Sequence, residues 1–211
     1  MVSKRLELIF DFGSPNAWLS HLVLPDIEAR TGVKFSYQPV LLGGIFRATG
    51  NRSPAEAYAN IRNKMAYEHL EMERFIRRHG VTRFRFNPYF PVNTLQLMRG
   101  AVAAQREDVF APYVEAVFSA MWEHPRKMDD PEVFRAALTD AGLPAERLLR
   151  RAADQDVKDE LLAKTNQAVE RGVFGIPSFF VGDELYFGKD RLRDVEEEIL
   201  RRQNAGAGAA A

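Results

Sequence analysis

The stretch from Gly172 to Val181 limits the possible folds of this chain more than any other feature. It places Pro177 between a glycine turn and an apolar run of strand-forming residues. Folded proteins keep a cis X-Pro bond in such a place where the backbone meets a ligand or turns tightly. We therefore predict a cis peptide bond between Ile176 and Pro177, followed directly by a strand.

A second informative run lies at residues 6–15 and reads Leu-Glu-Leu-Ile-Phe-Asp-Phe-Gly-Ser-Pro. Its first part predicts a short strand that ends at Asp11, and the glycine predicts a turn. Ser14 followed by Pro15 is typical of a helix N-terminus, with the serine as the N-cap. We interpret Ser14 and Pro177 as two halves of one site.

Composition excludes several classes of protein. The chain has 211 residues, of which 46% are hydrophobic, enough to bury the core of one domain with a large insertion. Lys plus Arg and Asp plus Glu both number 29, and this balance argues against a nucleic-acid or membrane-surface partner. No long apolar run and no secretion leader is evident, so we expect a cytoplasmic protein. The chain contains no cysteine, which excludes disulfides and a cysteine nucleophile.

The N-terminal part predicts a β-α-β unit. A strand is expected at Leu6–Asp11, a helix from Pro15 to about Arg30 closed by Gly32, and a second strand at Val33–Leu41. The following segment, Leu42–Pro54, carries several glycines, and we expect it to be a loop.

Helical periodicity then dominates for more than one hundred residues. Asp130-Pro131 predicts a helix start, and residues 142–144 predict a stop and restart. After Gly172 we expect strands at Pro177–Val181 and Leu185–Phe187 around a Gly-Asp turn, and a last helix from Asp190 to about Arg202. The Gly/Ala-rich residues 204–211 are expected to be a disordered tail.

The order β-α-β, helical block, β-β-α is that of an α/β thioredoxin-like fold with a large all-helical insertion. We predict a thioredoxin-like domain at residues 1–41 plus 172–203 and a helical insertion domain at residues 42–171. In this fold the first helix and the loop before the third strand meet at one end of the sheet, which would bring Ser14 next to Ile176 and Pro177.

Six short motifs in this order resemble a known family. The chain is similar to the kappa-class glutathione transferases and, more closely, to the 2-hydroxychromene-2-carboxylate isomerases, which share a DsbA-like variant of the thioredoxin fold. The likeness extends from Leu6 to about Leu200. The motifs that carry it are Asp11–Pro15, Asn51, Lys64–Tyr67, Phe90–Thr94, Val173–Pro177 and Phe187–Arg191.

The resemblance implies glutathione as the cofactor. Ser14 would stand where redox members of the fold have a cysteine, and as the catalytic residue it would hydrogen-bond the glutathione sulfur and lower the pKa of that thiol. A helix N-terminus favours such an anion. The backbone of Ile176, beside Pro177, would pair with the cysteinyl part of glutathione. The segment Phe187-Gly188-Lys189-Asp190-Arg191 would hold its γ-glutamyl group, with Asp190 on the ammonium.

The resemblance also implies the reaction. The glutathione thiolate would add to 2-hydroxychromene-2-carboxylate, the ring would open, and elimination would give trans-o-hydroxybenzylidenepyruvate with glutathione regenerated. We expect the small aromatic carboxylate to bind among apolar rings and polar side chains, namely Phe46, Tyr89 and Phe90 with Asn51, Asn93, Arg62 and Lys64. The family commonly has a lysine in the loop near Phe46, and this chain has none there. Relatives of this kind imply a homodimer.

Less specific interpretations stay open. Ser14 and Asp190 are also ordinary helix caps, and Pro177 can be a trans proline of an edge strand. Lys64 and Arg62 can belong to a solvated helix face. The four histidines lack metal-ligand spacing, so we expect no metal site. For the function, a kappa-type transferase or peroxidase that consumes glutathione on electrophiles is the alternative, and a non-enzymatic binding module is a third.

Overall fold

A mixed sheet of four strands forms the centre of the protein. The structure is a computed structural model that describes residues 6–208. Strands β1 (Leu6–Phe10), β2 (Ser36–Pro39), β3 (Ser178–Val181) and β4 (Glu184–Phe187) are arranged in the order β2-β1-β3-β4. β1 is parallel to β2 and antiparallel to β3, and β3 is antiparallel to β4. This arrangement confirms the predicted thioredoxin-like order of elements.

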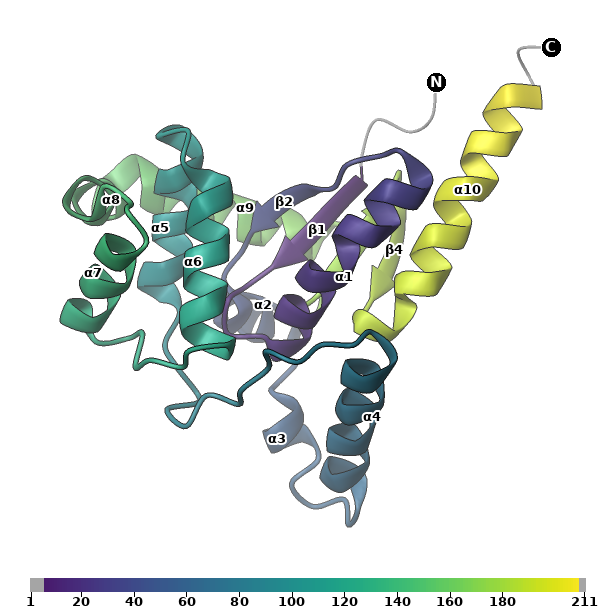
Figure 1. Ribbon diagram of the computed structural model, residues 1–211, viewed down its shortest axis with the longest axis horizontal. Helices are drawn as coiled ribbons and strands as arrows, with labels where there is room; N and C mark the ends of the chain where they lie inside the picture. The colour runs from purple at the N-terminus through teal and green to yellow at the C-terminus, as the bar shows by residue number, and fades with distance from the viewer. Residues whose placement is uncertain (1–5, 209–211) are drawn as a thin grey trace.

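Helices cover both faces of this sheet (Figure 1). α1 (Pro15–Thr31) and α10 (Leu192–Gly208) lie over one face, and α9 (Gln155–Glu170) passes behind the other. The remaining helices gather at one end and below the sheet, and they are α2 (Leu42–Thr49), α3 (Pro54–Ala57), α4 (Lys64–Arg78), α5 (Leu95–Arg106), α6 (Phe110–Trp122), α7 (Pro131–Asp140) and α8 (Ala145–Ala152). All four strands fall within residues 1–41 and 172–203, while the division of the chain into two domains stays a prediction.

The predicted helix signals act as expected in α1 and α7. Ser14 caps α1 by accepting a hydrogen bond from the N–H of Ala17, and Gly32 ends the helix with a φ of 70° that glycine adopts without strain. Asp130 caps α7 by accepting from the N–H groups of its first turn, and Pro131 takes the first helical position. These caps fix where α1 begins and therefore where the Ser14 side chain lies.

The segment expected as a loop at Leu42–Pro54 is largely helical, so this prediction was wrong. α2 spans Leu42–Thr49 despite its two glycines, and a short helix, α3, begins at Pro54. The glycines permit close packing on α9: a Cβ on Gly44 would lie only 3.0 Å from Cγ2 of Thr165. Gly50 is the residue that ends α2, and its φ of 69° is the left-handed conformation common at helix C-termini.

Two further boundaries differ from the sequence expectation. The second strand is shorter than Val33–Leu41, because only Ser36–Pro39 pair with β1. The last helix continues to Gly208, so residues 204–208 of the expected disordered tail are helical, since alanines favour a helix once a preceding turn has nucleated it. Residues 209–211 of that tail lie outside the described part. A three-residue 3₁₀ turn, η1 (Lys189–Arg191), precedes this helix.

An aromatic core joins the sheet to the helical region. The rings of Phe10 and Phe12 meet edge to face at 5.3 Å, and the ring of Phe118 on α6 lies 4.8 Å from Phe12. Tyr113 on the same helix is fully buried and donates a hydrogen bond to the carbonyl oxygen of Leu97 on α5 at 2.7 Å. Such pairs stabilise the packing beyond the area that they bury. They also fix the segment after β1 that leads to Ser14. Among residues 6–208, no helix combines the length and apolar character needed to cross a bilayer.

Candidate active site

Ser14 and the Ile176-Pro177 peptide lie face to face at one end of the sheet. The Ile176-Pro177 bond is cis, as predicted. The Ser14 hydroxyl donates a hydrogen bond to the carbonyl oxygen of Ile176 at 3.3 Å and accepts one from the N–H of Ala17 at 3.2 Å. Ser14 is therefore the cap of α1 and also a donor directed toward Ile176, and its catalytic role stays a prediction.

The segment between β1 and α1 is held from two sides. The carboxylate of Asp11 accepts hydrogen bonds from the N–H of Gly13 and the N–H of Leu42, each at 2.8 Å. Trp122 Nε1 donates to the carbonyl oxygen of Phe12 at 2.8 Å. Asp11 is fully buried, and this burial raises the pKa of its carboxyl against the opposing effect of the backbone hydrogen bonds. These contacts set the position from which Ser14 starts its helix.

The segment after β4 forms the neighbouring wall. The N–H of Gly188 donates to the carbonyl oxygen of Pro177 at 2.9 Å. The Phe187 ring lies over Gly175, where an added Cβ would be only 2.7 Å from Cε2 of that ring. The Phe174 ring packs against the same ring at a tilt of 47°, with 4.6 Å between centroids. The structure thus brings the predicted residues Phe187 and Gly188 against the loop that contains Pro177.

The rest of the predicted γ-glutamyl site begins the last helical segment. Lys189 is buried, and its ammonium forms an ion pair with Asp190 at 2.6 Å and lies 4.9 Å above the Phe75 ring of α4. The Asp190 side chain is 61% exposed and keeps its carboxylate accessible to a ligand. Arg191 instead pairs with Asp194 on α10. Lys189 therefore serves as a buried link between η1 and α4.

A large cavity opens beside this site. It has a volume of about 870 Å³ and extends from Asp11 and Gly13 to helices α2, α5 and α9. Three of the predicted substrate residues line it, namely Phe46, Phe90 and Asn93. The walls are mostly apolar, as in pockets for small organic ligands.

The other four predicted substrate residues are not among the described residues that line the cavity. Asn51 donates from Nδ2 to the carbonyl oxygen of Phe174 at 2.7 Å. Lys64 pairs with Glu68 at 2.6 Å, and Arg62 and Tyr89 are exposed. The structure therefore divides the predicted substrate set between the cavity and the surface around α3 and α4.

Sequence reasoning missed three basic residues of the cavity, Arg47, Arg99 and Lys158. Arg99 gave a usable signal, since it interrupts an apolar stretch of α5 between Met98 and Ala101. A charged residue there must either reach solvent or face a polar space. Lys158 lies on α9, a helix rich in charge, and Arg47 lies near the end of the short helix α2, so neither gave a comparable signal.

Two of the four histidines, His21 and His79, have structural partners, and His69 and His124 are exposed. His21 stacks on Phe118, and its Nδ1 lies 2.8 Å from the Tyr37 hydroxyl while its Nε2 lies 3.0 Å from Glu115. His79 packs against Phe75 on α4. No group of three or more potential His, Cys, Asp or Glu ligands occurs within the described residues, and the absence of a metal stays a prediction.

Comparison with known proteins agrees with this architecture. The sequence matches the model of the DSBA-like thioredoxin domain over residues 5–200. The chain belongs to this family. Among solved structures, the DSBA-like chain is similar to a 2-hydroxychromene-2-carboxylate isomerase with a TM-score of 0.79 and 27% identity, over 96% of this chain and 98% of that one. DsbA of Pseudomonas aeruginosa, at 15% identity and a TM-score of 0.58 over 97% and 85% of the two chains, shows the fold alone.

Two kinds of enzyme occur among the sequence relatives of this DSBA-like chain. The 2-hydroxychromene-2-carboxylate isomerase of Sphingobium xenophagum is 29% identical over 94% of this chain and all of its own length. Glutathione S-transferase kappa 1 of Rattus norvegicus is 26% identical over 90% and 88% of the two chains. These relatives support an enzyme of the isomerase or transferase type.

Proposed function

We propose that this DSBA-like protein is a glutathione-dependent isomerase of 2-hydroxychromene-2-carboxylate or a related aromatic carboxylate. The observation that carries the proposal is the Ser14 hydroxyl, which lies at the N-terminus of α1 and 3.3 Å from the Ile176 carbonyl oxygen. The relatives named 2-hydroxychromene-2-carboxylate isomerase supply the reaction class, since they match almost the entire chain.

The residues around Ser14 fit glutathione by the chemistry of their donors and acceptors. The chain has no cysteine, so a thiol at this site must come from a bound molecule. The Ser14 hydroxyl can turn from Ile176 toward a sulfur atom, and the positive end of α1 favours the thiolate form of that sulfur. The backbone of Ile176 next to Pro177 would pair with the extended tripeptide. The exposed carboxylate of Asp190 would bind its ammonium group.

When bound, glutathione supplies a nucleophilic thiolate. Ser14 would keep negative charge on the sulfur by donating its hydroxyl hydrogen, and the fixed segment around Asp11 would keep that donor in position. The neighbouring cavity, with Phe46 and Phe90 in its walls, would hold the aromatic substrate and limit access of water. The chain thus contributes orientation and charge stabilisation, and it needs no side-chain nucleophile of its own.

The test is turnover of 2-hydroxychromene-2-carboxylate by the purified full chain, followed by its ultraviolet spectrum with and without reduced glutathione. We expect isomerisation that depends on glutathione while the total concentration of free thiol stays constant. A chain that binds glutathione but leaves the spectrum of the chromene carboxylate unchanged would contradict the proposal.

A transferase activity is the second candidate, because the kappa-class transferases match the chain over nearly the same length. The same preparation should then be incubated with chlorodinitrobenzene. Consumption of thiol with chlorodinitrobenzene and no isomerisation of the chromene carboxylate would favour this alternative.

A further inference from the structure

Arg99 is a partly buried cation that has no ion-pair partner among residues 6–208. It lies on α5 and lines the cavity, and its Nε is buried and finds no hydrogen-bond acceptor among the described residues. Arg106, two turns later on the same helix, pairs with both Asp156 and Glu160. Arg99 forms no such ion pair within residues 6–208, and a guanidinium in this position requires an anion to compensate its desolvation.

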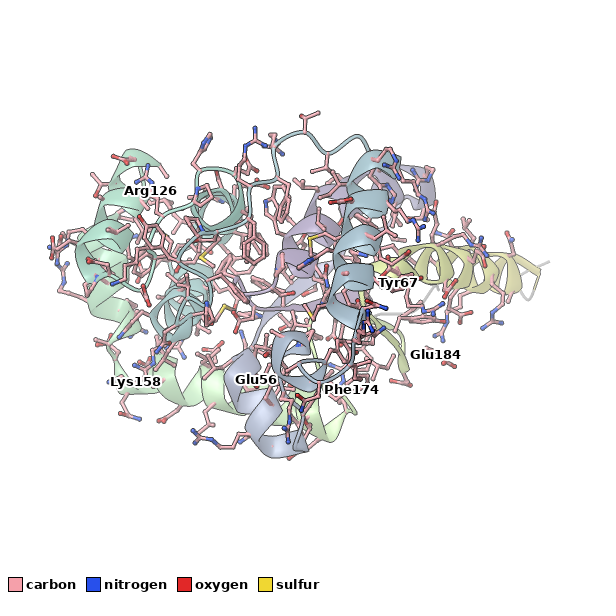
Figure 2. The ribbon with its side chains drawn as sticks, turned by 90° about the horizontal axis from the view of Figure 1, so that it is seen from below. Glu56, Tyr67, Arg126, Lys158, Phe174 and Glu184 are labelled. Carbon is pink, nitrogen blue, oxygen red and sulfur yellow. The ribbon has the colours of Figure 1, made fainter. Side chains whose placement is uncertain are left out.

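Two more basic side chains line the same cavity from other elements. Arg47 comes from α2 and Lys158 from α9, and neither pairs with an acidic residue in the described part of the chain. In Figure 2, Lys158 lies well away from Tyr67 on α4, the helix that carries the basic residue predicted to bind the substrate. No residue of α4 is among the described residues that line the cavity, so the cations of the cavity and those of α4 are separate groups.

The acidic residues of the cavity offset the positive charge of these cations only in part. Asp11 is buried, and its two oxygens accept hydrogen bonds from the N–H groups of Gly13 and Leu42, while burial raises its pKa. Asp159 accepts from the amide of Gln155. Three cations thus stand against two carboxylates, so the cavity keeps an excess of positive charge even when both carboxylates are ionised.

The cavity walls indicate the rest of the ligand. Phe46, Phe90 and Leu161 line the cavity together with the basic residues, and its volume of about 870 Å³ lies within the usual range for small-molecule sites. Apolar walls with a cluster of cations suit a flat aromatic ring that carries a carboxylate. An arginine binds a carboxylate through two parallel hydrogen bonds, which also fixes its orientation.

We propose that Arg99, supported by Arg47 and Lys158, binds the carboxylate of the aromatic substrate. This assignment rests on the proposed function and replaces the expectation that the carboxylate meets Arg62 or Lys64. Because the cavity also reaches Gly13, the residue before Ser14, a ligand held by Arg99 has room to extend its uncharged part toward the thiol site. Arg99 is thus a residue that determines specificity for acids over neutral aromatic compounds.

The experiment compares two unreactive probes, 2-naphthoate and 2-naphthamide, by calorimetry with the full chain in the absence of glutathione. We expect the wild type to bind the naphthoate more tightly than the amide. Arg99→Gln should weaken naphthoate binding on the order of 10-fold or more and leave naphthamide binding nearly unchanged, because only the charged pair is lost. Arg150→Gln on α8, an exposed arginine outside the cavity, is the matched control and should bind both probes like the wild type.

Lys158→Gln provides a second variant in case Arg99→Gln folds poorly, and it should reduce naphthoate affinity by a smaller factor. Wild-type naphthoate affinity in both Arg99→Gln and Lys158→Gln would overturn the assignment, as would a loss seen in Arg62→Gln instead. The binding experiment contains no glutathione, so it tests the carboxylate site independently of turnover. Tighter binding of naphthoate that requires Arg99 would support this site even if the protein did not turn over the chromene carboxylate. Turnover with an unchanged KM in Arg99→Gln would support the proposed function and contradict this site.

Discussion

The buried carboxylate of Asp11 joins the segment that carries Ser14 to the first turn of α2, because its Oδ2 accepts a hydrogen bond from the N–H of Leu42 at 2.8 Å. Its Oδ1 accepts from the N–H of Gly13 within the same segment. One side chain therefore fixes the segment that leads to Ser14 and one wall of the cavity at the same time. Ser14 and the cavity share this support.

Replacement of Ser14 by alanine should separate catalysis from binding. Ser14→Ala should bind glutathione about as well as the wild type, raise the pKa of the bound thiol and slow isomerisation on the order of 10²-fold, as expected for loss of one oriented donor to an anion. Loss of the cap to Ala17 should lower the free energy of unfolding by about 1 kcal/mol. The thiol pKa is measured by titrating the thiolate absorbance near neutral pH. Equal pKa values and equal turnover in both proteins would leave Ser14 with a capping role only.

Glutathione should raise the melting temperature, and Asp190→Ala should remove most of that increase, because the exposed carboxylate would no longer bind the ammonium group. Asp190 also pairs with the buried Lys189, so the variant is expected to melt earlier even without ligand. The quantity to compare is therefore the ligand-induced shift within each protein. Asp129→Ala, which removes an exposed carboxylate elsewhere, is the control. A full shift in Asp190→Ala would remove Asp190 from the glutathione site.

The variant Gly100→Ala should destabilise the helical region. A Cβ at Gly100 would overlap the hydroxyl of Tyr113 and lie 2.9 Å from its Cζ, so the ring must move and its hydrogen bond to Leu97 must break. Overpacking of this kind costs about 1–3 kcal/mol, measurable by urea unfolding. In the Tyr113→Phe background the same change should cost less, since the hydroxyl is absent. An equal cost in both backgrounds would show that the clash is not with the hydroxyl.

Asp11 should influence the pH dependence of stability in the opposite sense to most carboxylates. Burial raises the folded-state pKa of the Asp11 carboxyl above its ordinary value of 3.8, so the native state binds the proton more tightly than the unfolded state. Its contribution to the free energy of unfolding is then favourable at low pH and is lost as pH rises from about 3.8 through the folded pKa. In Asp11→Asn this contribution is absent, and stability should rise more steeply with pH in that window. Urea unfolding between pH 3.5 and about 7 measures both slopes, and parallel curves would contradict the assignment.

The fold was predictable where local signals and tertiary structure agree. Ser14 with Pro15, Gly32 and the Ile176-Pro177 bond each have a local physical meaning, and the structure confirms them. The segment Leu42–Pro54 was wrongly predicted as a loop because its glycines were counted as helix breakers. The close packing of Gly44 on Thr165 requires that position 44 has no side chain, and this is why a glycine lies within α2.

The residues that line the cavity were only partly predictable, because local sequence patterns do not show how distant helices pack together. Phe46, Phe90 and Asn93 belong to motifs and line it, whereas Arg99 and Lys158 reach it from helices that are distant in sequence. Which face of α5 or α9 borders an open space depends on how the helices pack, and periodicity alone does not contain that information.

The hydrogen bond from Asn51 to the carbonyl oxygen of Phe174 links residues 123 positions apart. It joins the segment that follows α2 to the loop that precedes β3. The chain between Asn51 and Phe174 is therefore held together at its two ends. Insertions or deletions far from these ends, for example between α7 and α8, would leave Ser14 and Ile176 in place. Members of such a family can therefore vary these helices while Ser14 and the Ile176-Pro177 peptide keep their positions.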